Sequence, residues 1–174
     1  MTGLPTLATA RLRLRRRVPD DAGALFATMA DAGAMRWWSC APFDSVDAVR
    51  QHFGDGTFGG RAWAVTRSDD DTAIGFVVAN AHRQAGVVEI GYLIARDAWG
   101  AGVAREAVSA VVAHLFASGT RRVFADSDPD NAGSIRLLRA MGFTLEGRLR
   151  AEWETHIGVR DALIFGLLRD EWRG

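Results

Sequence analysis

The chain has 174 residues, a length typical of one domain, and its 21 basic and 21 acidic side chains cancel at neutral pH. This balance argues against nucleic acid or an acidic membrane as a partner, and one cysteine cannot form an intrachain disulfide or a cysteine zinc site. The four histidines are scattered singly, so we expect no metal. Neither a signal-peptide core nor a run of about 20 apolar residues, the length of a membrane span, is present. We therefore expect a single domain, residues 1–174, in the cytoplasm.

The first element is a predicted strand in "RLRLRRR", where Leu12 and Leu14 share one face. The arginines at 15–17 that end it are interpreted as a solvated strand edge, with a nucleic-acid patch as the alternative. Pro19 and two aspartates then favour a helix start, because negative charge is stabilised at a helix N-terminus. A second short helix follows, capped by Asp44 or Ser45.

The middle of the chain predicts two strands joined by an acidic turn, and then a mostly apolar strand that is typical of a sheet centre. A long helical pattern begins near Gly102 and stops at Gly119. A strand, a helix and an antiparallel strand pair complete the chain. This order predicts an α/β fold with a mixed sheet, and not a doubly wound nucleotide-binding fold.

Two glycines, Gly100 and Gly102, separate the apolar strand from the long helix. A helix N-terminus has unpaired N–H groups and a partial positive charge, and glycine lets a ligand approach the backbone closely. Such a turn can hold a pyrophosphate, although a tight turn without a ligand is equally compatible with the spacing. A P-loop lysine is missing, and Arg105 stands where a dinucleotide fingerprint has its third glycine. Coenzyme A is an example of a ligand whose binding needs neither the lysine nor the third glycine.

With these motifs, the chain resembles GNAT-type N-acetyltransferases, specifically the RimJ/RimL-like branch. The resemblance is carried by "EIGYLIARDAWGAGVAREAV", "DSDPDNAGSIRLLRAMGFTLEGRLR" and "RDALIFGLLRDEW", and the N-terminal half matches as well. It implies a GNAT-like mixed central sheet of about six to seven strands, flanked by about four helices and splayed at the middle strands. It also implies acetyl-CoA as co-substrate, without a metal. Asp97 stands where the family pattern has glutamine or arginine, a departure common in this branch.

The resemblance assigns residues to the co-substrate. Main-chain N–H groups of the turn would hold the pyrophosphate, and the preceding strand would pair with the pantetheine arm. Asn131 would contact the pantetheine or the turn; its alternative role is to cap a helix. The residues assigned to the strand and the turn are Leu93, Ile94, Ala95, Trp99, Gly100, Ala101, Gly102, Val103 and Ala104.

Two residues are candidates for catalysis. Glu89 lies in an apolar strand, where burial raises a carboxyl pKa toward values useful for a general base. Its alternative roles are to face water or to fix an arginine, and Glu106 is a weaker candidate for the base. By resemblance, Ser134 is the acid that protonates the departing sulfur; it could instead simply occupy the first turn of a helix. Tyr92 could donate that proton, but its place in the strand favours packing.

The acceptor amine is expected near the adjacent Trp37 and Trp38, because two neighbouring indoles cannot both point into one core. A lid or an oligomer interface is the alternative role. The expected function is transfer of acetyl to a primary amine by direct attack in a ternary complex. The acceptor is a protein N-terminus, with ribosomal proteins among the candidates, or a small amine. A non-catalytic acyl-CoA-binding or regulatory module and an antibiotic or polyamine acetyltransferase are the alternatives. A homodimer is left open.

Overall fold

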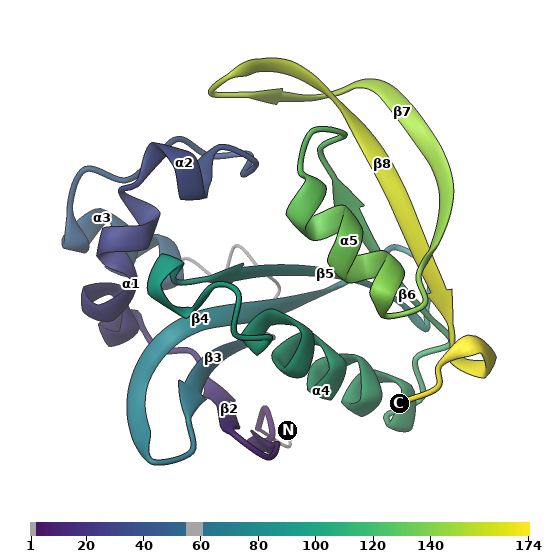
Figure 1. The fold of residues 1–174 in the computed structure, drawn as a ribbon, viewed down its shortest axis with the longest axis horizontal. Coiled ribbons are helices and arrows are strands. Elements are labelled where there is room, and N and C mark those ends of the chain that lie inside the picture. The colour runs from purple at the N-terminus through teal and green to yellow at the C-terminus, as the bar shows by residue number, and fades with distance from the viewer. Residues whose placement is uncertain (1–2, 55–60) are drawn as a thin grey trace.

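The computed structural model describes residues 3–54 and 61–174. These residues form one mixed sheet with the strand order β1-β2-β3-β4-β5-β6-β8-β7 (Figure 1). All neighbouring strands are antiparallel except β5 and β6, which are parallel. The strands are β1 (Leu7–Ala8), β2 (Leu12–Arg16), β3 (Ala62–Arg67), β4 (Asp70–Ala81), β5 (Val87–Ile94), β6 (Arg122–Ser127), β7 (Thr144–Thr155) and β8 (Gly158–Leu168).

The α-helices are α1 (Ala22–Met29), α2 (Ala32–Met35), α3 (Val46–Gly54), α4 (Val103–Ala117) and α5 (Ala132–Ala140), and short 3-10 turns are η1 (Pro19–Asp21), η2 (Arg96–Ala98) and η3 (Arg169–Glu171). The predicted mixed α/β fold is confirmed. The sheet has eight strands, more than the six to seven that the resemblance implied. The two-residue β1 and the single-turn α2 are too short to show a hydrophobic period. No helix in the described part of the chain is long and apolar enough to cross a membrane.

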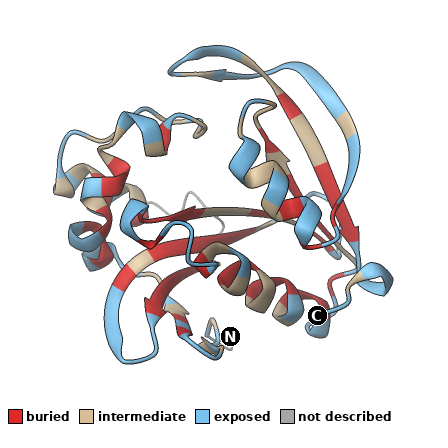
Figure 2. Ribbon diagram, in the orientation of Figure 1, coloured by how far each residue is buried: buried red, intermediate tan, exposed pale blue. Residues whose placement is uncertain are grey.

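The strands of the sheet carry many buried residues, red in Figure 2, and these residues divide between two cores. Alternate residues of a strand point to opposite faces. On β3, Trp63 and Val65 therefore pack in the core that contains α4, whereas Ala62 and Ala64 pack in the core that contains α1 and α3. Ser45, one of the two predicted caps, accepts a hydrogen bond from the Ala48 N–H at 3.2 Å at the start of α3.

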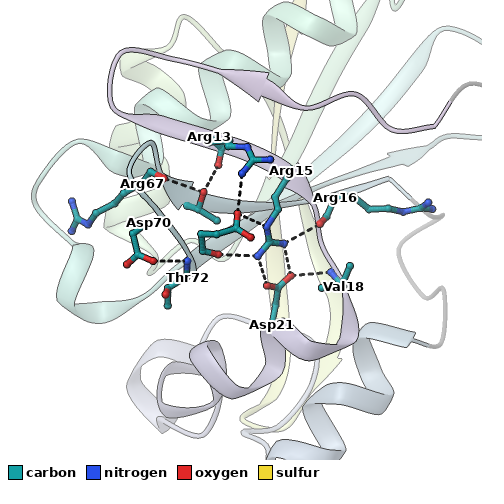
Figure 3. A network of polar contacts seen from close by, with 10 residues as sticks. Arg13, Arg15, Arg16, Val18, Asp21, Arg67, Asp70 and Thr72 are labelled. Atoms are coloured by element: carbon teal, nitrogen blue, oxygen red, sulfur yellow. Dashed lines mark hydrogen bonds and ion pairs between the residues drawn. The ribbon is translucent and has the colours of Figure 1, made fainter.

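The arginines at the end of β2 are used within the fold (Figure 3). The Arg15 guanidinium donates to both oxygens of the Asp21 carboxylate at 2.7 and 3.0 Å, and to Asp71 at 2.8 Å. The Arg17 guanidinium lies 4.1 Å from the centre of the Phe53 ring. Arg15 and Arg17 are half-buried, whereas Arg16 is exposed. The predicted solvated edge is therefore wrong for Arg15 and Arg17, because Asp21, Asp71 and Phe53 come from elements that sequence reasoning could not place beside β2.

The two central strands diverge, as the resemblance implied. The registered pairs of β5 with β6 are Val87 with Arg122, Val88 with Val123 and Glu89 with Phe124. After Glu89, β5 remains paired with β4 as far as Ile94, but β6 turns away from it. The sheet is therefore splayed at its middle, and the opening begins beside Glu89.

Candidate active site

A cleft with a volume of about 850 Å³ lies where β5 and β6 part. Its walls come from the α2 region, β4, β5, the turn before α4, the end of β6, the start of α5 and the β7–β8 hairpin. All of the predicted site residues line it except Ala95 and Ala101. The splayed sheet thus gathers into one space residues that are far apart in the sequence.

Ala95 and Ala101 have main-chain groups that are engaged within the protein. The Ala95 N–H donates to the Ile74 carbonyl at 2.8 Å, and its own carbonyl accepts from the Ala98 N–H at 2.9 Å. The Ala101 carbonyl accepts from Arg11 Nη1 at 3.1 Å. The geometry therefore gives no support to Ala95 as a partner strand for a ligand, because its strand-type hydrogen bonds are already made.

The turn before α4 needs its glycines for backbone conformation. Gly100 and Gly102 have φ values of 76° and 77°, in the left-handed region that side chains disfavour. The first helical hydrogen bond runs from the Glu106 N–H to the Gly102 carbonyl at 3.1 Å, so the amides before Glu106 have no partner inside the helix. A β-carbon added at Gly100 would have no atom within 4 Å. The turn thus presents amides and open space to the cleft.

Arg11 and Glu106 form an ion pair next to this turn. The Glu106 carboxylate accepts from Arg11 Nε at 2.8 Å and from the Thr9 hydroxyl at 2.6 Å. Burial opposes ionisation of Glu106, but the hydrogen bonds from Thr9 and Arg11 outweigh it and lower its pKa. Glu106 is therefore unsuited to be a base at neutral pH. Sequence reasoning missed Arg11, because nothing in the sequence next to it indicates a contact with Ala101, about 90 residues away.

Trp99 contacts the last residue of β5, at the end of the edge that β6 has left. Its indole Nε1 donates to the Ile94 carbonyl at 2.7 Å, while the side chain stays 51% exposed. The Arg96 guanidinium lies 5.3 Å from the centre of the indole ring. The Ile94 carbonyl is therefore occupied, whereas residues 90–93, which also line the cleft, lie on the edge that β6 has left.

Two half-buried carboxylates face the opening. Burial raises the pKa of Glu89, and the nearby charge of Asp126 raises it further. Burial also raises the pKa of Asp126, although Trp153 Nε1 donates to Asp126 Oδ2 at 2.6 Å. Within residues 3–54 and 61–174, the Glu89 carboxylate has no hydrogen bond or ion pair. Sequence reasoning missed Asp126, which only the β5–β6 register brings beside Glu89.

The Tyr92 and Ser134 hydroxyls form a second pair, with their oxygens 2.7 Å apart. Burial raises the pKa of Tyr92 to about 12, although the hydrogen bond with Ser134 opposes the shift. The phenol is therefore protonated at neutral pH. The sequence favoured packing for Tyr92, with proton donation as its alternative role, and the hydrogen bond connects β5 to the candidate acid on α5. We call these two residues the hydroxyl pair.

Asn131 caps α5, since its Oδ1 accepts the Ser134 N–H at 3.1 Å. The alternative role named from the sequence is thus confirmed. Asn131 also lines the cleft.

Trp37 and Trp38 both line the cleft and are both half-buried. The Trp38 ring packs edge-on against Phe76, with centroids 5.6 Å apart. The Arg36 guanidinium lies 4.9 Å from the centre of the Trp37 ring. The sequence predicted that one of the two indoles lines a pocket, and in the structure both line the cleft.

The comparisons with known proteins agree with this geometry. Residues 11–144 match the family described as "Acetyltransferase (GNAT) domain". The uncharacterized N-acetyltransferase p20 of Bacillus licheniformis is 32% identical over 98% of this chain and 100% of its own. A structure of a probable GNAT-family acetyltransferase from Chromobacterium violaceum has a TM-score of 0.89 and 26% identity over 98% of this chain and 89% of that one.

The RimJ protein of Mycobacterium smegmatis, solved in complex with CoA-disulfide, shares the fold, with a TM-score of 0.82 and 22% identity over 97% of this chain and 89% of that one. The family match covers most of the chain, from β2 to the start of β7. The expected sheet, its splayed centre and the glycine turn all lie within a GNAT fold. The chain therefore belongs to the GNAT family of acetyltransferases.

Proposed function

We propose that residues 1–174 form one catalytic domain that transfers acetyl from acetyl-CoA to a primary amine, by direct attack in a ternary complex. The observation that carries the proposal is the position of Glu89, whose carboxylate of raised pKa lines the same cleft as the Gly100–Gly102 turn. A proton acceptor thus shares one space with an anion-binding turn. Acylation of an amine by a thioester with an anionic tail needs both.

The turn and the start of α4 fit the pyrophosphate of the co-substrate. Gly100 leaves room before the unpaired amides of Val103 and Ala104, and the helix dipole favours an anion there. Arg105 and Arg136 also line the cleft and add positive charge. When bound, acetyl-CoA supplies an activated thioester carbonyl. The RimJ complex with CoA-disulfide supports this assignment through the shared fold.

The edge of β5 that β6 has left fits the pantetheine arm. Leu93 and its neighbours line the cleft on this edge, where β5 has lost its parallel partner. An extended, amide-bearing ligand can add to such an edge as a further strand. We place a second contact of the Asn131 amide on the same arm.

Proton transfers are assigned to the two faces of β5. Glu89 and Tyr92 are three residues apart and so point to opposite faces of the strand. Glu89 accepts a proton from the incoming ammonium, because only the neutral amine is a nucleophile. Ser134, hydrogen-bonded to the protonated Tyr92, donates to the departing sulfur. Trp37 and Trp38 contact the carbon chain of the acceptor.

A peptide N-terminus and a small amine are both candidate acceptors. The shared fold with RimL, a ribosomal L7/L12 alpha-N-protein acetyltransferase, favours the peptide. The two acidic side chains at the opening, Glu89 and Asp126, favour a small polyamine or an amino-bearing antibiotic, because such molecules carry more positive charge. An amine and peptide panel separates these classes.

The test is to incubate the protein with acetyl-CoA and a pooled panel of amines and peptides while free thiol is followed. We expect thiol release that depends on one panel member and a matching gain of one acetyl mass on that member. Gly102→Val, which puts a branched side chain at φ 77°, is the control for co-substrate binding. If acetyl-CoA binds tightly but no member releases thiol above background, the chain is an acyl-CoA-binding module and the proposal fails.

A further inference from the structure

Three hydrogen-bond acceptors stand side by side on adjacent strands at the opening of the sheet. Asn80 on β4 is in register with Glu89 on β5, and Glu89 is in register with Phe124 on β6. Registered partners point to one face, and so does the residue two positions further along a strand, which here is Asp126. Asn80, Glu89 and Asp126 therefore share one face, and all three line the cleft.

Asn80 offers an acceptor that the protein does not satisfy. Its Oδ1 is shielded from solvent, and no donor from the described residues reaches it. Buried amide oxygens are normally hydrogen-bonded, so an unpaired one that lines a cleft indicates a missing donor. Glu89 likewise has no donor within the described ranges. Asp126 receives one hydrogen bond, from Trp153 Nε1 to Oδ2.

No side-chain cation in the described part of the chain neutralises these carboxylates. The cationic neighbour, Arg160 on β8, is bound to Asp128 at 2.7 and 3.0 Å and to Asp130 at 2.6 Å. Glu152 on β7 adds further negative charge near Asp126. Among the described residues, every charged side chain that lines the cleft from β4, β5, β6 or β7 is thus an acid.

We propose that Asn80, Glu89 and Asp126 form a subsite that binds the acceptor as a primary alkylammonium group. The inference rests on the proposed function and adds two specificity-determining residues, Asn80 and Asp126. An –NH₃⁺ group has three N–H donors for the three acceptors and a positive charge for the two carboxylates. A hydroxyl group has one donor and no charge, and a quaternary ammonium has a charge and no donor. The subsite therefore selects primary amines.

The same geometry balances the protons of the reaction. The bound ammonium gives one proton to the carboxylates of Glu89 and Asp126 and becomes a neutral amine. The nitrogen lone pair then forms the C–N bond to the thioester carbonyl carbon as the C–S bond breaks. The second proton leaves the nitrogen for water, the sulfur gains a proton from the hydroxyl pair of Tyr92 and Ser134, and that pair regains a proton from water. The carboxylates return their proton to water.

The test uses the full chain without acetyl-CoA and follows the side-chain carboxyl carbons by NMR. The probes are n-butylammonium chloride, n-butanol and tetramethylammonium chloride. We expect n-butylammonium to shift the Glu89 and Asp126 signals at a concentration at least tenfold lower than either other probe. Asp126→Asn and Asn80→Ala should each weaken n-butylammonium binding about tenfold, the size expected for one hydrogen bond to a charged group. Asn80→Asp should bind at least as tightly as the wild type.

Asp69→Asn is the matched control, because Asp69 is an exposed acid in the turn between β3 and β4, outside the cleft. It should leave the binding of n-butylammonium unchanged. Equal binding of n-butylammonium and n-butanol, or unaltered binding in Asp126→Asn, refutes the subsite. If that happens while the panel assay still shows acetyl transfer, the proposed function stands without the subsite. If n-butylammonium binds as expected but nothing is acetylated, the proposed function fails, and the three residues are an ammonium-binding site but not an acceptor subsite.

Discussion

Gly100→Ala and Gly119→Ala form a matched pair that separates backbone strain from ligand binding. Both glycines have a positive φ, 76° and 99°, and at neither would an added β-carbon have an atom within 4 Å. The cost of each substitution is therefore conformational and amounts to about 1–2 kcal/mol. For a chain of this length, that lowers Tm by roughly 2–8 °C. The two variants should melt at similar temperatures.

They should differ in their binding of CoA. Gly100 lines the cleft, whereas Gly119 follows the far end of α4. A methyl group at Gly100 enters the space assigned to the pyrophosphate, and loss of one hydrogen bond to a charged group costs about 1.5–3 kcal/mol. Calorimetric titration with CoA should show at least a roughly tenfold weaker Kd for Gly100→Ala, and wild-type affinity for Gly119→Ala. Wild-type affinity in both would mean that this turn does not hold the pyrophosphate. An equal loss in both would trace the effect to stability alone.

Two further predictions concern the carboxylates. Glu89→Gln should lower kcat by about 10²–10⁴ with little change in CoA affinity, and should remove the rise in activity that the wild type shows as pH increases through the raised pKa of Glu89. An unchanged pH–rate profile would remove Glu89 as the base. The folded state holds the Glu89 proton more tightly than the unfolded state, so ionisation of Glu89 lowers the stability of the fold as pH rises. Glu89→Gln should therefore also have a higher Tm than the wild type at neutral pH. Trp153→Phe deletes a hydrogen bond that lowers the pKa of Asp126, so Asp126 is less ionised and raises the pKa of Glu89 less. The rising limb should therefore move to lower pH in rate measurements, and an unmoved limb would show that Asp126 takes no part in it.

Local signals in the sequence predicted the glycine turn and the burial of Glu89. The Gly-x-Gly spacing before a helical pattern indicated a turn with backbone that other residues avoid, and both glycines have a positive φ. A glutamate in an apolar strand required burial and a raised pKa, which Glu89 has. The divergence of the central strands was predicted from the family resemblance and not from any property of the residues themselves.

The rest of the site depends on register, which a single sequence does not reveal. Asn80 and Asp126 come beside Glu89 only through the antiparallel pairing of β4 with β5 and the parallel pairing of β5 with β6. Trp153 reaches Asp126 after an irregular stretch of β7, where Ala151 has a φ of 52°. Alanine rarely adopts that conformation, so its presence in the sequence gives no sign of the irregularity.

The divergence of β5 from β6 has a kinetic consequence. The cleft is lined from one face of the sheet by Asn80 and Glu89 and from the other by Ser134 and Leu137. An acceptor that enters from the first face and a co-substrate that enters from the second do not have to pass one another. On the proposed function, the fold imposes no order of arrival or departure. We then expect relative affinities to set the order of binding and release, which initial-rate measurements can test.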